Sequence, residues 1–171
     1  MKAFQEVSLK ILAVGVVVLM SAIVLQVVCS ALDINPLAIF QTDTPLLGKA
    51  ITLNSLLDFQ WHILVIVGLM PAGLVWLHGN HVRVDFLYNP MLPRWKARID
   101  LAGNLLFAAP FFCLMLPASI KFFQRAWTSD EASRNGGLND LWLIKSVLPF
   151  GLLLLALAVM VETLRLLRAV R

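Results

Sequence analysis

Residues 59–88 read FQWHILVIVGLMPAGLVWLHGNHVRVDFLY, an uncharged apolar run followed by a short polar stretch. The run Phe59–Leu77 has 19 residues without a charge, and an α-helix needs ~20 apolar residues to cross the ~30 Å hydrocarbon layer of a bilayer. The stretch His81–Tyr88 contains Arg83 and Asp85, which are costly inside a bilayer. The sequence therefore predicts a membrane-spanning helix that ends near Leu77, and a return of the chain at the membrane surface.

Three more uncharged runs surround this stretch. They contain 22, 20 and 16 residues, and they are Ile11–Leu32, Leu101–Ile120 and Ser146–Val161. Of the 171 residues, 60% are hydrophobic and 14% are charged, whereas soluble domains are about 45–50% apolar and about 25% charged. We therefore expect an all-α integral membrane protein that forms a single membrane domain over residues 1–171. Its four transmembrane helices are expected at about residues 11–32, 57–77, 97–123 and 141–165.

The first run could also be read as a secretory signal, because Lys2 and Lys10 precede it and small residues lie near its end. Its uncharged part has 22 residues, whereas the apolar part of a signal peptide has about 7–15. We therefore expect this segment to remain in the protein as a membrane helix.

The distribution of Lys and Arg predicts which side of the membrane each loop faces. With both termini in the cytoplasm, nine of the 14 cations lie inside and five lie outside, in agreement with the positive-inside rule. The third loop, residues 121–145, carries four cations and is the exception. The five Trp residues lie at or just beyond the predicted span ends, where amphipathic rings prefer to lie. The sequence thus predicts a multi-pass protein with both termini cytoplasmic.

The segment between the second and third spans has a helical period. Its apolar residues recur at Val84, Leu87, Tyr88 and Met91. This period predicts an amphipathic interfacial segment between helices two and three. Pro93 then suits the first turn of the next helix, where its missing N–H costs nothing.

The two predicted outer loops carry signals of turns and helix starts. The first, residues 33–57, is long and partly apolar, so we expect it to lie against protein or lipid headgroups. Ser55–Asp58 has a capping-box pattern, in which side-chain oxygens accept unpaired amide hydrogens at the start of the second span. In the third loop, Gly136 and Gly137 predict a turn. Asp140 is expected to cap the fourth span.

Prolines interrupt three of the four predicted spans. They are Pro71, Pro110, Pro117 and Pro149. Each removes the N–H that the carbonyl four residues earlier would use, and in lipid that carbonyl needs a protein partner or water. The bent helices could pack within this chain or fit a larger membrane partner, and the sequence leaves both readings open.

The chain lacks the residues that transport by this chain alone, or catalysis, would need. No ionisable residue lies in the middle of a predicted span, although a transporter normally has one there. No nucleophile–base pair, phosphate-binding loop or zinc-type spacing occurs, and no basic run is interleaved with aromatic residues. We therefore expect no enzyme activity, no bound cofactor or metal and no nucleic-acid partner. Cys29 and Cys113 fall inside spans and are expected to be packing residues.

Three segments together resemble one known family. Gly79–Tyr88 (GNHVRVDFLY), followed by Leu92–Arg94, resembles the signature of the small membrane subunit of tripartite ATP-independent periplasmic (TRAP) transporters, the DctQ-like family. Asp100–Gly103 resembles the family's opening of span three, and residues 136–151 resemble its approach to the last span. The resemblance covers roughly residues 56–165 and is weaker over the first 55.

The resemblance implies a scaffold or anchor subunit of a sodium-coupled uptake system in the bacterial inner membrane. In such a system a periplasmic substrate-binding protein captures an organic anion of the carboxylate or sulfonate type. A large multi-span TRAP membrane subunit then carries the anion inward with sodium, and the sodium is expected in that subunit. Membrane lipid is the remaining partner expected. Two other functions stay open, a small four-helix transporter acting alone as a homo-oligomer and a membrane anchor of an enzyme complex.

The candidate structural or interface residues are His81, Arg83, Asp85, Tyr88, Lys145, Pro149, Gly136 and Gly137. Arg83 and Asp85 could form an interfacial pair within the hairpin or contact the large subunit. Lys145 could be an anchor whose charged end reaches the membrane surface, or a polar contact between helices.

Overall fold

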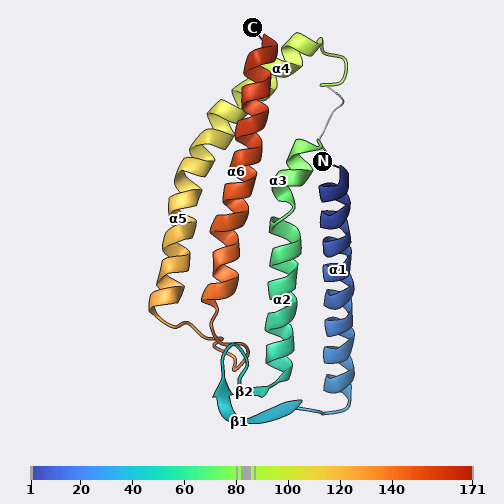
Figure 1. The fold of residues 1–171 in the computed structure, drawn as a ribbon, viewed down its shortest axis with the longest axis vertical. Coiled ribbons are helices and arrows are strands. Elements are labelled where there is room, and N and C mark those ends of the chain that lie inside the picture. The colour runs from blue at the N-terminus through green and yellow to red at the C-terminus, as the bar shows by residue number, and fades with distance from the viewer. Residues whose placement is uncertain (1, 80, 82–85, 87, 171) are drawn as a thin grey trace. The chain divides into compact units, whose positions relative to one another are not determined.

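The computed structural model describes residues 2–170 except residues 80, 82–85 and 87, and most of these residues are helical (Figure 1). The helices are α1 (Lys2–Ala31), α2 (Leu53–Leu69), α3 (Ala72–Leu77), α4 (Pro93–Gly103), α5 (Ala109–Thr128) and α6 (Trp142–Val170), with a π-helix at Asn104–Ala108. Two short strands, β1 (Ala38–Thr44) and β2 (Gly48–Ile51), lie between α1 and α2 in the chain.

Four helical segments in the described part of the chain are long and apolar enough to cross a membrane. They are Ser8–Ala31, Leu53–Leu77, Pro93–Thr128 and Trp142–Arg168. Their ends lie within five residues of the predicted span ends. The predicted class, an all-α membrane protein with four transmembrane helices, is confirmed.

The helices divide into two compact units, which are described separately. Unit 1 consists of residues 1–69 and 122–147, and unit 2 consists of residues 70–121 and 148–171. Both α5 and α6 contribute residues to each unit. The single membrane domain over residues 1–171 stays a prediction.

In unit 1, α1 and α2 lie side by side (Figure 1). Gly15 permits this approach, because a Cβ there would lie 2.9 Å from Cγ2 of Val67. The Gln60 side chain donates to the Ala22 carbonyl at 3.2 Å and to Oε1 of Gln26 at 2.6 Å. Polar side chains within a membrane segment stabilise helix pairs through such hydrogen bonds. The amide of Gln60 therefore fixes α2 against α1.

The first loop contains a small antiparallel hairpin, which the sequence reading did not predict. Ala38 pairs with Ile51 and Thr44 with Gly48, with an irregularity between Ile39 and Thr44. The turn is closed by the Thr44 hydroxyl, which donates to the Gly48 carbonyl at 2.7 Å. The first strand reads AIFQTDT, three apolar residues followed by four polar ones, so it lacks the alternation of apolar and polar residues that indicates a strand.

In unit 2, two close approaches bring α6 against neighbouring helices. A Cβ at Gly73 of α3 would lie 2.8 Å from the carbonyl oxygen of Leu154 in α6. Asn104, at the start of the π-helix, is 8% exposed, and its amide donates to the Thr163 hydroxyl of α6 at 3.0 Å. A glycine and a buried amide thus fix α6 against two different segments.

The prolines interrupt the spans only in part, because Pro117 and Pro149 lie inside the continuous helices α5 and α6, where the sequence predicts a break. Pro71 separates α2 from α3, and Pro93 occupies the first turn of α4 after an extended Leu92. Pro110 lies two residues after the end of the π-helix, whose wider turn removes the need for the hydrogen bond that a proline cannot donate. Pro117 lies inside α5.

Few apolar side chains are buried among the residues that the structure describes. The buried ones are Ala22, Cys29, Ala126, Leu138, Leu152, Ala158 and Val159. Cys29 is therefore a packing residue as expected, whereas Cys113 on α5 is exposed, so the prediction is wrong for Cys113. Large apolar side chains are exposed along the spans, as expected for helices that face lipid or another membrane subunit.

Candidate functional site

Two loops in unit 1 are joined by hydrogen bonds, and we call residues 33–52 and 129–141 the loop pair. The Asn139 N–H donates to the Leu46 carbonyl at 2.8 Å, and the Leu46 N–H donates to Oδ2 of Asp140 at 3.1 Å. Gly48, with φ +66°, lies beneath Asn139, whose Nδ2 would be 3.0 Å from an added Cβ. Because hydrogen bonds cannot cross a bilayer, both loops lie on the same side of the membrane.

A second set of contacts joins the start of α2 to the glycine turn of the third loop. The Thr52 hydroxyl donates to the Gly136 carbonyl at 3.1 Å, and the Asn54 amide donates to the Asn135 carbonyl at 2.6 Å. Gly136 has φ +69°, a conformation that a glycine adopts without strain. The turn predicted at Gly136 is therefore present and is held from the first loop.

The carboxylate of Asp58 occupies the space that Gly137 leaves free. Its Oδ2 accepts the Leu138 N–H at 3.1 Å. Gly137 is buried, and a Cβ there would overlap this carboxylate and lie 2.9 Å from Oγ of Ser133. Gly137 is therefore required by the close approach of the Asp58 side chain to the third loop.

The capping box lies three residues earlier than the sequence reading placed it. The Ser55 N–H donates to Oγ1 of Thr52 and the Thr52 N–H donates to Oγ of Ser55, both at 3.2 Å. Thr52 directly precedes α2 and is the N-cap residue, so Thr52–Ser55 replaces Ser55–Asp58 as the box. The error arose because Asp58, which fits the pattern, is bound by the third loop instead.

Asp140 also departs from its predicted role as the cap of α6. Its carboxylate accepts the Leu46 N–H, and it is the Asp140 carbonyl that accepts the Leu143 N–H, at 3.1 Å. Asp140 has φ 55°. This main-chain conformation turns its side chain toward the first loop.

Lys145 lies at the beginning of α6, where it contacts the end of α5 and the third loop. Its ammonium forms an ion pair with Glu131 and lies 4.5 Å from the centre of the Phe122 ring. The Lys145 side chain is 17% exposed. Beside it, the rings of Trp127 and Trp142 meet edge to face at 4.4 Å. The charge of Lys145 is thus neutralised by a residue of the same unit.

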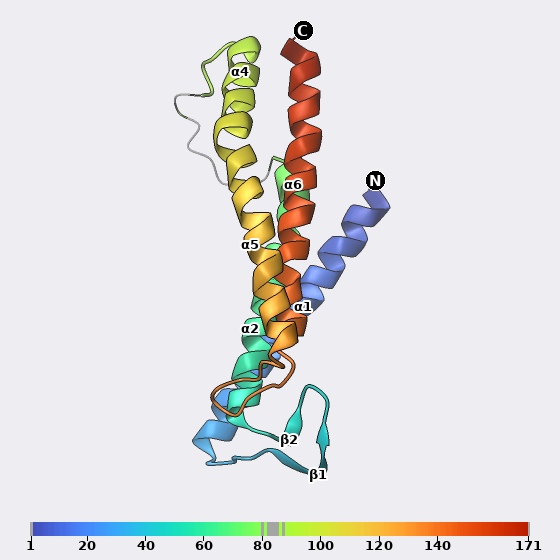
Figure 2. The ribbon, with the colours of Figure 1, turned by 90° about the vertical axis from the view of Figure 1, so that its left-hand side faces the viewer.

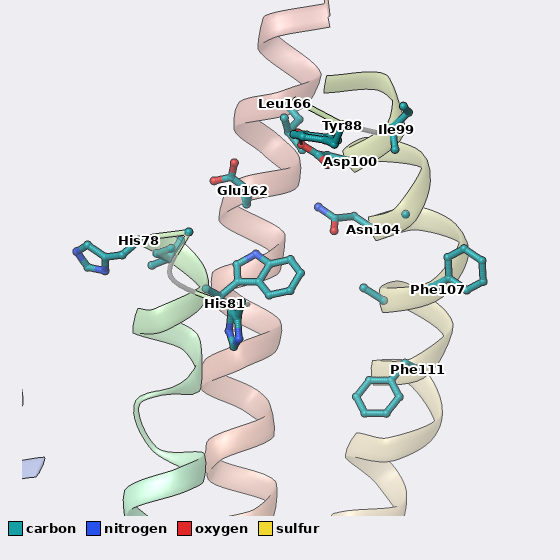
Figure 3. Close-up of a pocket in the computed structure, with 15 residues that line it drawn as sticks. His78, His81, Tyr88, Ile99, Asp100, Asn104, Phe107, Phe111, Glu162 and Leu166 are labelled. Atoms are coloured by element: carbon teal, nitrogen blue, oxygen red, sulfur yellow. Dashed lines mark hydrogen bonds between the residues drawn. The ribbon is translucent and has the colours of Figure 1, made fainter. Parts of the chain in front are cut away.

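The predicted hairpin residues that the structure describes lie in unit 2. The Tyr88 hydroxyl donates to Oδ2 of Asp100 at 2.6 Å (Figure 3), and the Lys96 ammonium lies 5.1 Å from the centre of the Tyr88 ring. The His81 ring lies 5.6 Å from the Trp76 ring. Tyr88 is therefore tied to the start of the third span.

Arg83 and Asp85 lie outside the described residues, as do Val84 and Leu87, so the amphipathic period stays a prediction. The described residues 86 and 88–90 are in turns. Pro149 lies inside α6 and is half-buried. The structure thus brings Gly136, Gly137 and Lys145 into unit 1, and His81 and Tyr88 into unit 2.

The described residues contain no group of three or more His, Cys, Asp or Glu that could hold a metal ion. Their charged side chains near the span ends pair locally, as in the 3.6 Å contact between Arg165 and Glu162. These features define a class of protein. It is a multi-pass membrane protein with four apolar spans, and its described residues form no cluster of metal-binding side chains.

The family follows from a comparison with known proteins. The family described as "Tripartite ATP-independent periplasmic transporters, DctQ component" matches residues 46–169. The chain therefore belongs to the DctQ family and is a small TRAP transporter component, which is not a family of enzymes. The family works with a large membrane subunit and a periplasmic binding protein. Searches of curated proteins and of solved structures found no match.

The match begins ten residues before the predicted limit near residue 56, at residue 46. It therefore includes Leu46 and Thr52, which form hydrogen bonds to the third loop, and Gly48, which lies against Asn139. The sequence reading missed these residues. The spacing of Thr52 and Ser55 was a usable signal for the cap, but no local pattern indicates a partner 80 or more residues away, as for Asp58 and Leu138.

Proposed function

We propose that this chain is the scaffold and anchor subunit of a sodium-coupled TRAP uptake system for organic anions of the carboxylate or sulfonate type. The large membrane subunit carries the substrate and the sodium, and this chain supports it in the bacterial inner membrane. The observation that carries the proposal is the family match over residues 46–169.

The charged side chains near the span ends are paired with each other, and this favours a scaffold role over a transporting role. A residue that binds a translocated ion needs a polar side chain free to exchange partners inside the membrane. Lys145 is paired with Glu131, and Glu162 with Arg165, near the span ends. The exposed apolar side chains along the spans, including Leu106 and Leu114 on one helix, offer surface for a larger subunit or for lipid.

Reconstitution separates the scaffold from the alternatives. We expect proteoliposomes with the large subunit, this chain and the binding protein to take up substrate when a sodium gradient is present. We expect this chain alone to give no uptake, and the large subunit without it to lose stability or activity. Uptake by this chain alone would favour the homo-oligomeric transporter. A redox cofactor that co-purifies with the chain would favour the anchor of an enzyme complex.

We propose that both termini face the cytoplasm and that the loop pair faces the periplasm, where it is placed to meet the binding protein. Arg134 and Arg94 are both exposed, and they lie in the third loop and at the start of α4. In a background without Cys29 and Cys113, Arg134→Cys should react with an impermeant thiol reagent added to intact cells, and Arg94→Cys should not. The reverse pattern would invert the topology.

Arg83 and Asp85, which lie outside the described residues, are proposed to act in assembly. Substitution of either is expected to reduce co-purification with the large subunit without changing substrate capture by the binding protein. Co-purification equal to that of the unchanged chain would exclude this role.

A further inference from the structure

The helical segment formed by α4 and the π-helix has two faces with different residues. One face lines a cavity of unit 2 with Asp100, Gly103 and Asn104 (Figure 3). The opposite face is exposed, and its residues recur at helical intervals. We call this exposed face the outward face, and its residues are Arg94, Trp95, Arg98, Ala102, Leu105 and Leu106.

The outward face changes from cationic to apolar along the helix. Arg94 and Arg98 are about one turn apart at its beginning, and both are exposed. Leu105 and Leu106 are at its other end and are 55% and 69% exposed. At 1.5 Å per residue, the distance from Arg94 to Leu106 is about 18 Å. The face is therefore suited to a molecule with an anionic group at one end and an apolar chain at the other.

The length of the third candidate span places the arginines among the lipid headgroups. The span Pro93–Thr128 has 36 residues, or about 54 Å of helix, whereas the hydrocarbon layer is ~30 Å thick. Its uncharged part, Leu101–Ile120, has 20 residues, which cover about 30 Å and fill that layer. Arg94 and Arg98 precede this part, so they lie at the depth of the lipid phosphates.

The guanidinium of Arg98 is held by an aromatic ring and keeps its hydrogen-bond donors. Its Cζ lies over the Trp95 ring, 5.2 Å from the ring centre. This contact uses the charge of the guanidinium and none of its five N–H groups. Trp95 is 50% exposed, as expected for a ring at the membrane–water interface. The ammonium of Lys96, by contrast, donates to the Asn89 carbonyl at 3.1 Å.

The charge of this segment favours a phosphate over other partners. Residues 86–99 contain three cations and no Asp or Glu. A guanidinium binds phosphate oxygens through two parallel N–H bonds. A protein partner would have to bring carboxylates to this depth, where they are costly, whereas every bilayer supplies phosphates there. Phosphatidylglycerol carries only the phosphate charge, and the ammonium of phosphatidylethanolamine would be repelled by the arginines.

We propose that the outward face binds one anionic phospholipid of the phosphatidylglycerol type. Its phosphate is bound by Arg94 and Arg98, and its acyl chain follows Ala102, Leu105 and Leu106. This site is additional to the proposed scaffold role. It also holds for either orientation of the chain, because both leaflets of a bilayer contain phosphates.

Native mass spectrometry of the complete chain, purified with any subunit that accompanies it, tests the proposal. The protein is equilibrated with equal amounts of phosphatidylglycerol and phosphatidylethanolamine of the same acyl composition. We expect phosphatidylglycerol to be retained in about five- to thirtyfold excess, the range for one or two cations beside an anionic lipid. Equal retention of the two lipids, or no retained lipid, would overturn the proposal.

A pair of double variants tests whether the lipid is on the outward face. Arg94→Gln/Arg98→Gln should bring the ratio of the two lipids close to one. The matched control is Lys49→Gln/Arg134→Gln, which removes the same charge from two exposed residues of the loop pair. We expect the control to keep the excess of phosphatidylglycerol. An equal loss in both double variants would mean that net charge, and not this face, selects the lipid.

Photocrosslinking of the unchanged chain keeps the test independent of how any variant folds. Phosphatidylglycerol with a diazirine on its acyl chain should label residues 102–106 more strongly than Val14, Val17 and Val24 of α1, which are each 62% exposed. Equal labelling of the two helices would overturn the proposal. So would a photoreactive amino acid at position 102 that captures a segment of another subunit in place of lipid.

Discussion

The loop pair of unit 1 and the cavity of unit 2 differ in the sequence distance over which their polar groups are paired. In unit 1, Asp58 of α2 meets Leu138 of the loop pair, and Asp140 meets Leu46 within the loop pair, at separations of 80 and 94 residues. Around the cavity, Tyr88 meets Asp100 at a separation of 12, and Asn104 meets Thr163 at a separation of 59. Figure 2 shows the loop segments between the strands and the start of α6 from a second direction.

The difference shows where the chain determines its own conformation. Each long-range hydrogen bond in the loop pair fixes two loops at once, so their arrangement follows from residues of this chain. Around the cavity, Tyr88 and Asp100 are close in sequence, and the Asn104–Thr163 hydrogen bond joins two helices. We therefore expect substitutions in the loop pair to act on the stability of the chain itself. Substitutions around the cavity should act more weakly.

Gly137→Ala should have the largest effect and would break the loop pair. The new Cβ overlaps the Asp58 carboxylate and approaches Ser133, and an overpacked buried site costs about 1–3 kcal/mol. We expect a lower midpoint of thermal unfolding in detergent, followed by the intrinsic fluorescence of the chain, to which Trp127 and Trp142 of unit 1 contribute. These two rings are in contact in the same unit.

Gly136→Asn is the matched control for this substitution. Gly136 has φ +69°, and a Cβ there meets no atom within 4 Å, while asparagine is among the residues that tolerate this conformation. We expect a small change in the midpoint. A larger loss for Gly136→Asn than for Gly137→Ala would contradict the packing of Asp58 against Gly137.

Asp58→Ala should have an intermediate effect, through the partner that it leaves behind. Leu138 is 4% exposed, and its N–H would lose the carboxylate that accepts it. An unsatisfied buried donor costs about 1–3 kcal/mol. Asp58→Asn keeps an acceptor oxygen and should lose less. Hydrogen exchange measures the outcome directly, since the Leu138 amide should exchange faster in Asp58→Ala than in Asp58→Asn; equal rates would mean that Asp58 does not hold the third loop.

The membrane part of this fold could be predicted from the sequence, because the bilayer imposes a length and a polarity on every span. The four uncharged runs predicted spans whose ends the structure places within five residues. The break at Pro71 and the helix start at Pro93 also follow from local chemistry, since a proline lacks its N–H wherever it lies.

The loop pair could be predicted only in part, because its contacts join residues that are far apart in the chain. Gly136 and Gly137 indicated a turn, but nothing near Gly137 indicates that the Asp58 carboxylate fills the space beside it. Asp58 and Asp140 were both assigned to helix starts on local patterns, and both are bound by the opposite loop. Local capping patterns therefore mislead where a distant main-chain N–H competes for the same carboxylate.

The smallest loss of stability is expected for substitutions of Asn104 and Thr163. These two residues form a long-range hydrogen bond in unit 2, so they test the comparison between the loop pair and the cavity. The Asn104 amide donates to the Thr163 hydroxyl at 3.0 Å, and that hydroxyl donates to the Val159 carbonyl at 2.8 Å. Thr163 therefore keeps a partner when Asn104 is replaced. A double-mutant cycle with Asn104→Ala and Thr163→Val should give a coupling of about 0.6 kcal/mol, the average for hydrogen bonds between membrane helices.

The size of this coupling tests whether pairing around the cavity is weaker than pairing in the loop pair. A coupling above about 2 kcal/mol would exceed the largest values typical of such pairs. Unit 2 would then be fixed by its own long-range hydrogen bond, as the loop pair is, and the proposed difference between the two regions would be wrong.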